Sequence, residues 1–294
     1  MNRAEFDALR AVAHTRSGDI SYVDAGTGPV ALFVHGLGTG AYLWRNLIEE
    51  LRGERRCIAF DLPLHGHSPA TDAHDFTLPG LARVIEDLCA ALGLDQVDLV
   101  ANDTGGAVAQ VFAAAHPERL RTFTLSNCET HDNLPNEAFQ GTVDLAKRGQ
   151  LAPAAVEMVK DIGGTRTGGR SVTLNYERPD DVSDETVRAY LEPIGGSLES
   201  ARQFERLVTS LHAADLLAAE DGLARLTAPT LIVWGTGDFH FEVEWAYRLR
   251  DLIPGATEVV ELDGAKLFFP DERAGEFAGH LRRHWQAHPA GVPA

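Results

Sequence analysis

Apolar residues along this chain follow two kinds of spacing. Short, nearly continuous apolar runs, which are typical of buried parallel strands, alternate with longer stretches in which apolar positions recur every three or four residues. The short runs predict strands at 19–24, 30–35, 57–61, 97–102, 121–127, 229–234 and 257–262. The longer stretches predict helices at about 43–53, 78–92, 105–115, 243–252 and 271–288. Thr77 and Pro79 support the second helix, as a capping residue and a first-turn proline. The alternation predicts an α/β fold, with a mostly parallel sheet flanked by helices.

This alternation stops in the middle of the chain. Residues 132–225 contain helical segments without a clear strand, and the stretch is too long to be a loop inside a compact domain. We therefore predict a core domain formed by 1–131 and 226–294, with an inserted helical cap, or lid, at 132–225. A lid excludes water from a pocket and shapes it. The alternative is an insertion that has no functional role.

Composition narrows the range of partners. The net charge of −17, from 43 acidic and 26 basic residues, gives a surface that repels nucleic acid and anionic membranes. No apolar run is long enough to cross a bilayer. Three cysteines are too few, and odd in number, for a disulfide framework, which favours a reducing compartment. The pair Gly105-Gly106 lacks the spacing of a dinucleotide-binding fingerprint. We expect a cytoplasmic protein without a cofactor that acts on a small-molecule substrate, and the oligomeric state stays open.

Residues 97–107, VDLVANDTGGA, join an apolar strand to a small-residue helix through a reactive side chain. A nucleophile elbow needs small residues two positions before and two positions after the reactive one, because its turn is sharp and strained. Ala101 and Gly105 occupy those positions around Asp103. The turn would lift the Asp103 carboxylate to the end of the sheet and to a helix N-terminus, where an anion is stabilised and can act as a nucleophile. The alternative is that Asp103 only caps the helix.

With this elbow, the chain resembles the α/β-hydrolase superfamily, and in particular its aspartate-nucleophile branch of haloalkane dehalogenases and epoxide hydrolases. Besides the elbow, the resemblance rests on HGLGTGAYLWRN at 35–46, DLPLHGHS at 61–68 and WGTGD at 234–238. It covers both flanks of the predicted lid. The resemblance implies an α/β-hydrolase fold with the reactive residue at the carboxyl edge of the sheet.

The resemblance also implies roles for individual residues. The backbone N–H groups of Leu37 and Thr104 would form an oxyanion hole. Asp238 falls on the position of the acid of a catalytic triad, and Glu129 falls on an alternative acid position. The same motifs supply further candidate pocket residues, which are His35, Trp44 and Asn102.

The turn after the last predicted strand departs from the family pattern. The branch has its catalytic histidine there, whereas this chain has Lys266 and Leu267, with Leu267 at the histidine position. In the two-step mechanism of the branch, a carboxylate forms an ester with the substrate and the histidine activates water to hydrolyse it. We therefore expect the first step to proceed and the second to need another base. Both residues are kept as candidate pocket residues.

Two further departures concern the substrate. Dehalogenases hold the leaving halide with side-chain N–H groups, but at the corresponding positions this chain has Thr104 and Leu37, whose side chains have none. Epoxide hydrolases use a pair of lid tyrosines as the acid. Tyr176 and Tyr190 are available for that role, or they pack in the core of the lid itself.

A histidine elsewhere is the first candidate for the relocated base. His240 lies two residues beyond Asp238, and His131 follows the strand before the lid, so both lie at the carboxyl edge of the sheet, where ligands bind in open α/β sheets. Asp238 and Asp132 flank them and would raise their basicity. Both histidines can equally face solvent. Loop spacing alone does not define a metal site here, and we expect none.

The favoured function is hydrolase-type attack by Asp103 on a small or medium apolar electrophile, such as an epoxide, an alkyl halide or an ester. The first alternative is a non-hydrolytic enzyme of the same fold, a cyclase, lyase or isomerase, in which Asp103 is a general acid or base. The second is a catalytically silent ligand-binding homologue.

Overall fold

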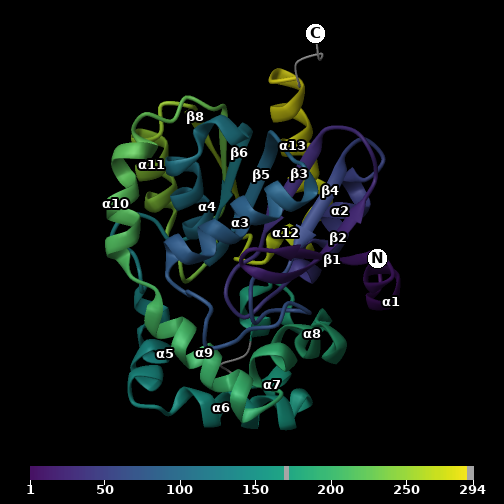
Figure 1. Ribbon diagram of the computed structural model, residues 1–294, viewed down its shortest axis with the longest axis vertical. Coiled ribbons are helices and arrows are strands. Elements are labelled where there is room, and N and C mark those ends of the chain that lie inside the picture. The colour runs from purple at the N-terminus through teal and green to yellow at the C-terminus, as the bar shows by residue number, and fades with distance from the viewer. Residues whose placement is uncertain (169–171, 290–294) are drawn as a thin grey trace.

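A mostly parallel sheet forms the centre of the molecule (Figure 1). The computed structural model describes residues 1–168 and 172–289, and these form one eight-stranded sheet in the order β1-β2-β4-β3-β5-β6-β7-β8. β2 is antiparallel to both of its neighbours, and the pairs from β4 to β8 are all parallel. The strands are β1 (Arg10–Thr15), β2 (Gly18–Ala25), β3 (Val30–Val34), β4 (Arg56–Phe60), β5 (Val97–Asn102), β6 (Leu120–Ser126), β7 (Thr230–Gly235) and β8 (Ala256–Leu262).

Each strand predicted from the apolar runs is confirmed, because the central strands are buried on both faces. Every residue of β5 and β7 is buried, as the continuous apolar runs require. β1 was not predicted, because its residues are mostly exposed or half-buried at the edge of the sheet and no apolar run marks it.

Helices flank the sheet, and α3 and α4 lie in front of it in Figure 1. The core helices are α1 (Arg3–Asp7), α2 (Arg45–Leu51), α3 (Leu78–Leu92), α4 (Thr104–Ala115), α11 (Val243–Leu252), α12 (Phe269–Glu272) and α13 (Ala274–Ala287). The predicted start of α3 is confirmed, because the Thr77 hydroxyl accepts a hydrogen bond from the Gly80 N–H at 3.1 Å. The single helix predicted at 271–288 is two helices, α12 and α13, which meet at Arg273.

The segment between β6 and β7 is helical. It contains α5 (Glu137–Lys147), α6 (Leu151–Lys160), α7 (Ile162–Thr167), α8 (Asp184–Gly195), α9 (Leu198–Ser210) and α10 (Ala213–Leu223). Helices α5 to α9 form a layer of their own at the bottom of Figure 1, below the sheet, and pack mainly on one another. Helix α10 instead runs back along the core and packs on α4. None of the described helices is both long enough and apolar enough to cross a membrane.

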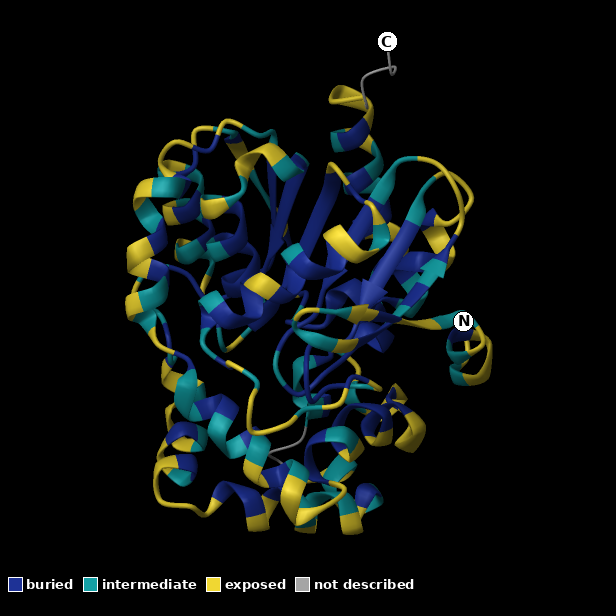
Figure 2. Ribbon diagram, viewed as in Figure 1, coloured by how far each residue is buried: buried dark blue, intermediate teal, exposed yellow. Residues whose placement is uncertain are grey.

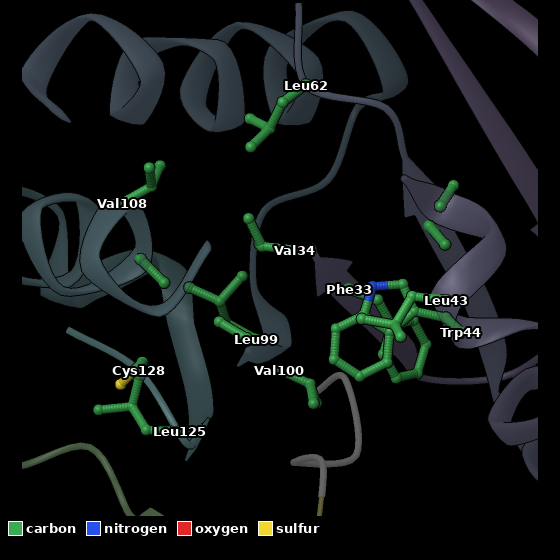
Figure 3. Packing of buried hydrophobic residues seen from close by; sticks show 14 of the residues in the cluster. Phe33, Val34, Leu43, Trp44, Leu62, Leu99, Val100, Val108, Leu125 and Cys128 are labelled. Carbon is green, nitrogen blue, oxygen red and sulfur yellow. The ribbon is translucent and has the colours of Figure 1, made fainter. Parts of the chain in front are cut away.

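The hydrophobic core lies in and around the sheet, where Figure 2 shows the central strands in the dark blue of buried residues. Trp44 belongs to this core. Its ring is fully buried and lies 5.2 Å, centroid to centroid, from the ring of Phe33. Figure 3 shows these two side chains next to each other. The structure thus places Trp44 in the packing between sheet and helix rather than at a pocket. All three cysteines are buried free thiols within the described part of the chain.

Candidate active site

The turn between β5 and α4 holds Asp103 in a strained backbone conformation. Asp103 has φ 56° and ψ −144°, a positive φ that residues other than glycine rarely adopt. The first turn of α4 packs tightly on the end of β3, since a Cβ added at Gly105 would lie 2.3 Å from the carbonyl oxygen of His35. The small residue expected two positions after Asp103 is therefore required by packing. The geometry matches the elbow predicted from the sequence.

The Asp103 carboxylate lies against the turn after β3. A Cβ at Gly36 would come within 2.1 Å of Asp103 Oδ2, so only glycine leaves room for the carboxylate there. Burial raises the pKa of Asp103 well above its usual value, and the nearby Glu129 carboxylate raises it further. The backbone N–H groups of Thr104 and Leu37 act in the opposite direction, because they donate hydrogen bonds to the carboxylate. The two N–H groups named from the sequence thus converge on Asp103.

Two more carboxyl groups lie close to Asp103. Glu129 follows β6 and Asp238 follows β7, so the three groups come from the carboxyl ends of adjacent parallel strands. Glu129 is 3% exposed, and its Oε1 accepts a hydrogen bond from the Thr104 hydroxyl at 3.0 Å. Burial raises the pKa of Glu129 to about 7, with a smaller contribution from Asp238, and burial likewise raises the pKa of Asp238 to about 7. The pKa values of all three carboxyl groups in this cluster are thus shifted upward, which favours their protonated forms relative to exposed carboxyl groups.

Asn127 connects the elbow to Asp238, and the sequence analysis did not single it out. Its carbonyl oxygen accepts a hydrogen bond from the Asp103 N–H at 2.8 Å. Its side-chain Nδ2 donates to Asp238 Oδ2 at 2.8 Å, and its Oδ1 accepts from the Gly235 N–H at 2.7 Å. Asn127 could have been predicted, because it is a polar residue at the carboxyl end of a buried strand. The same feature pointed to the other residues of the site.

Two buried histidines brace the turn that carries Leu37. His35 Nε2 accepts a hydrogen bond from the Leu62 N–H at 2.9 Å, so its Nδ1 carries the proton and donates to the Gly36 carbonyl at 2.8 Å. His65 Nε2 accepts from the Gly38 N–H at 3.2 Å. Burial lowers the pKa of His35, and burial lowers the pKa of His65 to about 3, so both rings stay neutral and structural. His35, a candidate pocket residue, therefore supports the turn.

The two candidate relocated bases make their polar contacts elsewhere. The backbone N–H of His240 donates to Asp238 Oδ1 at 2.8 Å, but its ring Nδ1 lies 3.3 Å from Asn136 Oδ1 at the start of α5. Burial lowers the pKa of His240 to about 4. His131 Nδ1 lies 2.9 Å from the Thr130 hydroxyl, so this ring is also engaged away from the elbow.

Asp132 faces the surface, where its carboxylate lies 3.5 Å from the Arg248 guanidinium in an exposed pair. The structure thus does not bring Asp132 to the carboxylate cluster. Across the residues that the structure describes, no group of three or more His, Cys, Asp or Glu side chains is arranged to hold a metal ion.

The turn after β8 is covered by the inserted segment. Leu267 is 3% exposed, and its carbonyl oxygen accepts a hydrogen bond from Asn102 Nδ2 at 3.1 Å. Asn102 Nδ2 therefore ties the end of β5 to this turn, while its Oδ1 is buried without a hydrogen-bond partner among the described residues. Lys266 Nζ donates to the Leu174 carbonyl at 3.2 Å, which directs its ammonium to the inserted segment.

Tyr176 and Tyr190 form a buried polar cluster with residues that the sequence analysis missed. Their hydroxyl groups lie 3.1 Å apart, and the Tyr176 hydroxyl donates to Asp271 Oδ2 at 3.0 Å. Arg45 Nη2 forms an ion pair with the same oxygen at 2.8 Å. Both tyrosines come from the inserted segment, while Arg45 and Asp271 come from α2 and α12 of the core. The pair thus fastens the inserted helices to the core through a buried carboxylate.

The space beside Asp103 is small and mostly apolar. A cavity of about 10 Å³, at the lower limit for one water molecule, is lined by Gly36, Leu37, Leu62, His65, Leu81, Thr104 and Leu207. Leu207 comes from α9, so the inserted helices close this space. A larger cavity of about 420 Å³ lies beside α13 near the amino end of β7, at the opposite edge of the sheet from Asp103.

Comparisons with known proteins agree with this architecture. A family model described as alpha/beta hydrolase fold matches residues 29–272. The chain is 27% identical over 288 residues to haloalkane dehalogenase 2 of Mycobacterium tuberculosis, covering 90% of each protein. It is 25% identical over 279 residues to epoxide hydrolase 1 of Caenorhabditis elegans, covering 90% of this chain and 67% of that protein. The crystal structure of haloalkane dehalogenase DbeA from Bradyrhizobium elkani matches with a TM-score of 0.77 at 22% identity, covering 95% of this chain and 99% of that one.

Proposed function

The chain belongs to the alpha/beta hydrolase fold family, and on this premise we propose that it is a hydrolase-type enzyme whose Asp103 carboxylate attacks a small or medium apolar alkyl electrophile, an alkyl halide or an epoxide. One observation carries the proposal. Asp103 is held at a strained elbow with the Leu37 and Thr104 N–H groups on its carboxylate. A strained backbone persists where the surrounding structure enforces it, which is common at reactive sites.

The chemistry of the first step follows from this arrangement. An Asp103 oxygen forms a bond to the electrophilic carbon, and the bond from that carbon to the halide or to the epoxide oxygen breaks. The product is an alkyl ester of Asp103. A halide leaves as an anion, whereas an epoxide oxygen stays on the alkyl group and becomes a hydroxyl by taking a proton from water. The two N–H groups would then stabilise the oxyanion that forms when water attacks this ester. Relatives named as a haloalkane dehalogenase and an epoxide hydrolase support a carbon electrophile of this kind.

The inserted helices act as a lid in this proposal. The cavity beside Asp103 is too small for an organic substrate, and Leu207 of α9 forms part of its wall. Entry of substrate therefore requires α9 to move away from the core. The leucine side chains around the cavity would favour an apolar substrate, because burial of apolar surface is the main gain they offer.

Intact-protein mass spectrometry tests the proposal. The protein is mixed with 1-bromohexane, 1,2-epoxyhexane and an activated ester in separate reactions, quenched at intervals and weighed, with Asp103→Asn as the control. We expect an adduct on the wild-type chain, with the mass of the hexyl group from the bromide, of the whole epoxide, or of the acyl group from the activated ester, and none on the control. The proposal would be contradicted if no reagent gave either an adduct or a product. An adduct on another residue, with the control labelled equally, would contradict it as well.

A second candidate function is supported by the protonation of the site. Burial and Glu129 raise the pKa of Asp103, which favours a carboxyl group that exchanges protons over a permanently charged nucleophile. In that case, the enzyme would catalyse proton transfer, as a cyclase, lyase or isomerase does. Product formed without an Asp103 adduct and without oxygen from labelled water would favour this second function.

A further inference from the structure

Hydrolysis of an Asp103 ester requires a base that takes a proton from water. At the position where the family places its histidine, this chain has Leu267, and the imidazoles of His131 and His240 are engaged with Thr130 and Asn136. A buried carboxyl group beside the elbow remains. This group is Glu129, and its role rests on the Asp103 ester of the proposed function.

The Glu129 carboxylate is fixed on one side and free on the other. Its backbone is held where Gln110 Nε2 donates to the Glu129 carbonyl oxygen at 2.7 Å. Its Oε1 accepts a hydrogen bond from the Thr104 hydroxyl at 3.0 Å, and Thr104 directly follows Asp103 in the chain. Its Oε2 is fully buried and forms no hydrogen bond with another described residue, while the backbone N–H of Glu129 itself helps to stabilise the charged carboxylate. A buried carboxylate oxygen without a partner is unusual and calls for a functional explanation.

We propose that Glu129 is the general base of the second half-reaction, with Oε2 taking a proton from the water that attacks the ester carbonyl of Asp103. The contact to Thr104 would hold the side chain in place while Oε2 receives the proton. Thr104 therefore links the base to the turn that carries the ester.

The water oxygen forms a bond to Cγ of Asp103, and one water proton passes to Glu129 Oε2. The bond from Cγ to the alkyl oxygen then breaks, and the leaving alkoxide takes that proton from Glu129 and leaves as an alcohol. Asp103 returns as a carboxylic acid that contains the oxygen and the second proton of that water, and loss of this proton to solvent restores the carboxylate. No redox partner is needed.

Electrostatics suit this role. Burial is the largest cause that raises the pKa of Glu129 to about 7, and Asp238 raises it further. Both causes persist when Asp103 is a neutral ester, so Glu129 keeps a raised pKa in the intermediate. A base with a pKa near the working pH is available as a carboxylate and still accepts a proton readily.

Asp238 and His240 are less suited to accept the proton. Asp238 already accepts hydrogen bonds from Asn127 Nδ2 and from the backbone N–H groups of His240 and Phe241. Burial lowers the pKa of His240 to about 4, which makes its ring a weak base. Glu129, in contrast, has both an open oxygen and a raised pKa.

Single-turnover labelling distinguishes this role from the first step. The reagent that labels Asp103 is mixed with wild type, Glu129→Gln, Glu129→Asp and His240→Gln, and with Glu244→Gln as a matched control at an exposed glutamate on α11. Adduct growth and decay are followed by mass in water enriched in ¹⁸O. Adduct growth reports the first step and shows that the elbow is folded, while decay reports the second.

We expect Glu129→Gln to form the adduct and to clear it roughly 10²–10⁴-fold more slowly than wild type, with Glu244→Gln unchanged. Clearance in wild type should rise with pH around the pKa of Glu129, about 7, and place ¹⁸O in the Asp103 peptide. Glu129→Gln should lose this pH dependence. If Glu129→Gln forms no adduct, clearance is measured in Glu129→Asp instead. Slower clearance in that variant than in wild type supports the role of Glu129 as the base.

Clearance at the wild-type rate in Glu129→Gln, or in Glu129→Asp if only that variant is labelled, would overturn the role. A stalled adduct in His240→Gln with normal clearance in Glu129→Gln would assign the base to His240 instead. An adduct that persists on wild type would leave the proposed function standing but remove this role from Glu129. Absence of adduct and product in every protein would overturn the proposed function itself.

Discussion

Replacement of Arg45 by methionine tests the energetics of the buried pair that fastens the inserted helices. Asp271 has a side-chain exposure of 3% and accepts hydrogen bonds from Arg45 at 2.8 Å, Tyr176 at 3.0 Å and Asn46 at 2.8 Å. Methionine keeps much of the arginine stem but removes the guanidinium, which leaves a buried carboxylate without its cation. Breaking a buried ion pair in this way typically costs about 3–5 kcal/mol. We expect a loss of that size in the free energy of unfolding.

The loss should depend on pH. Burial raises the pKa of Asp271 in the folded protein, although Arg45 lowers it. An acid with a raised folded pKa loses stability as pH rises from its unfolded pKa to its folded pKa, at about 1.4 kcal/mol per pH unit. Without Arg45 the folded pKa rises further, so this loss extends to higher pH. The deficit of Arg45→Met relative to wild type should therefore be larger at about pH 8 than at about pH 5.

Urea unfolding followed by tryptophan fluorescence at both pH values measures these quantities. Asp271→Asn provides the second arm of a double-mutant cycle, because it removes the charge and keeps the shape. In that background, Arg45→Met should cost at least 1 kcal/mol less than it does alone, since the two side chains are in direct contact. The reasoning is wrong if Arg45→Met costs the same in both backgrounds, or if its deficit does not change with pH.

Three further perturbations follow from the site and from its packing. Gly36→Ala would place a methyl group 2.1 Å from Asp103 Oδ2 and push the carboxylate away from its N–H donors. Adduct formation, measured by intact-protein mass, should therefore slow by roughly 10²–10³-fold. The circular dichroism spectrum should stay unchanged. Because only the ionised carboxylate attacks, adduct formation should rise with pH through the raised pKa of Asp103. Glu129→Gln should move that midpoint to lower pH, because it removes a charge that raises the pKa, and a midpoint that stays in place would count against the coupling. Gly222→Ala would bring a Cβ to 2.6 Å from Ala114 Cβ between α10 and α4; it should lower the free energy of unfolding by about 1–3 kcal/mol, and urea unfolding with no loss would show that the helices shift freely.

Much of the fold could be predicted because its signals are local. A mostly apolar run favours a buried strand regardless of which elements pack against it, so β5 and β7 could be predicted from the sequence. The start of α3 was visible because a cap depends on residues three apart. β1 was missed because an exposed edge strand has no apolar run, and only pairing with β2 defines it.

The amino-acid sequence by itself determined the elbow around Asp103, because a sharp strand-to-helix turn demands small residues at fixed positions. It also placed Glu129 and Asp238 at strand ends, although their closeness depends on β5, β6 and β7 being neighbours. Only the tertiary structure decided which way the side chains turn. The ring of His240 lies at Asn136 and the Tyr176 hydroxyl lies at Asp271. A rotamer is set by partners far apart in the chain, and no local spacing encodes those contacts.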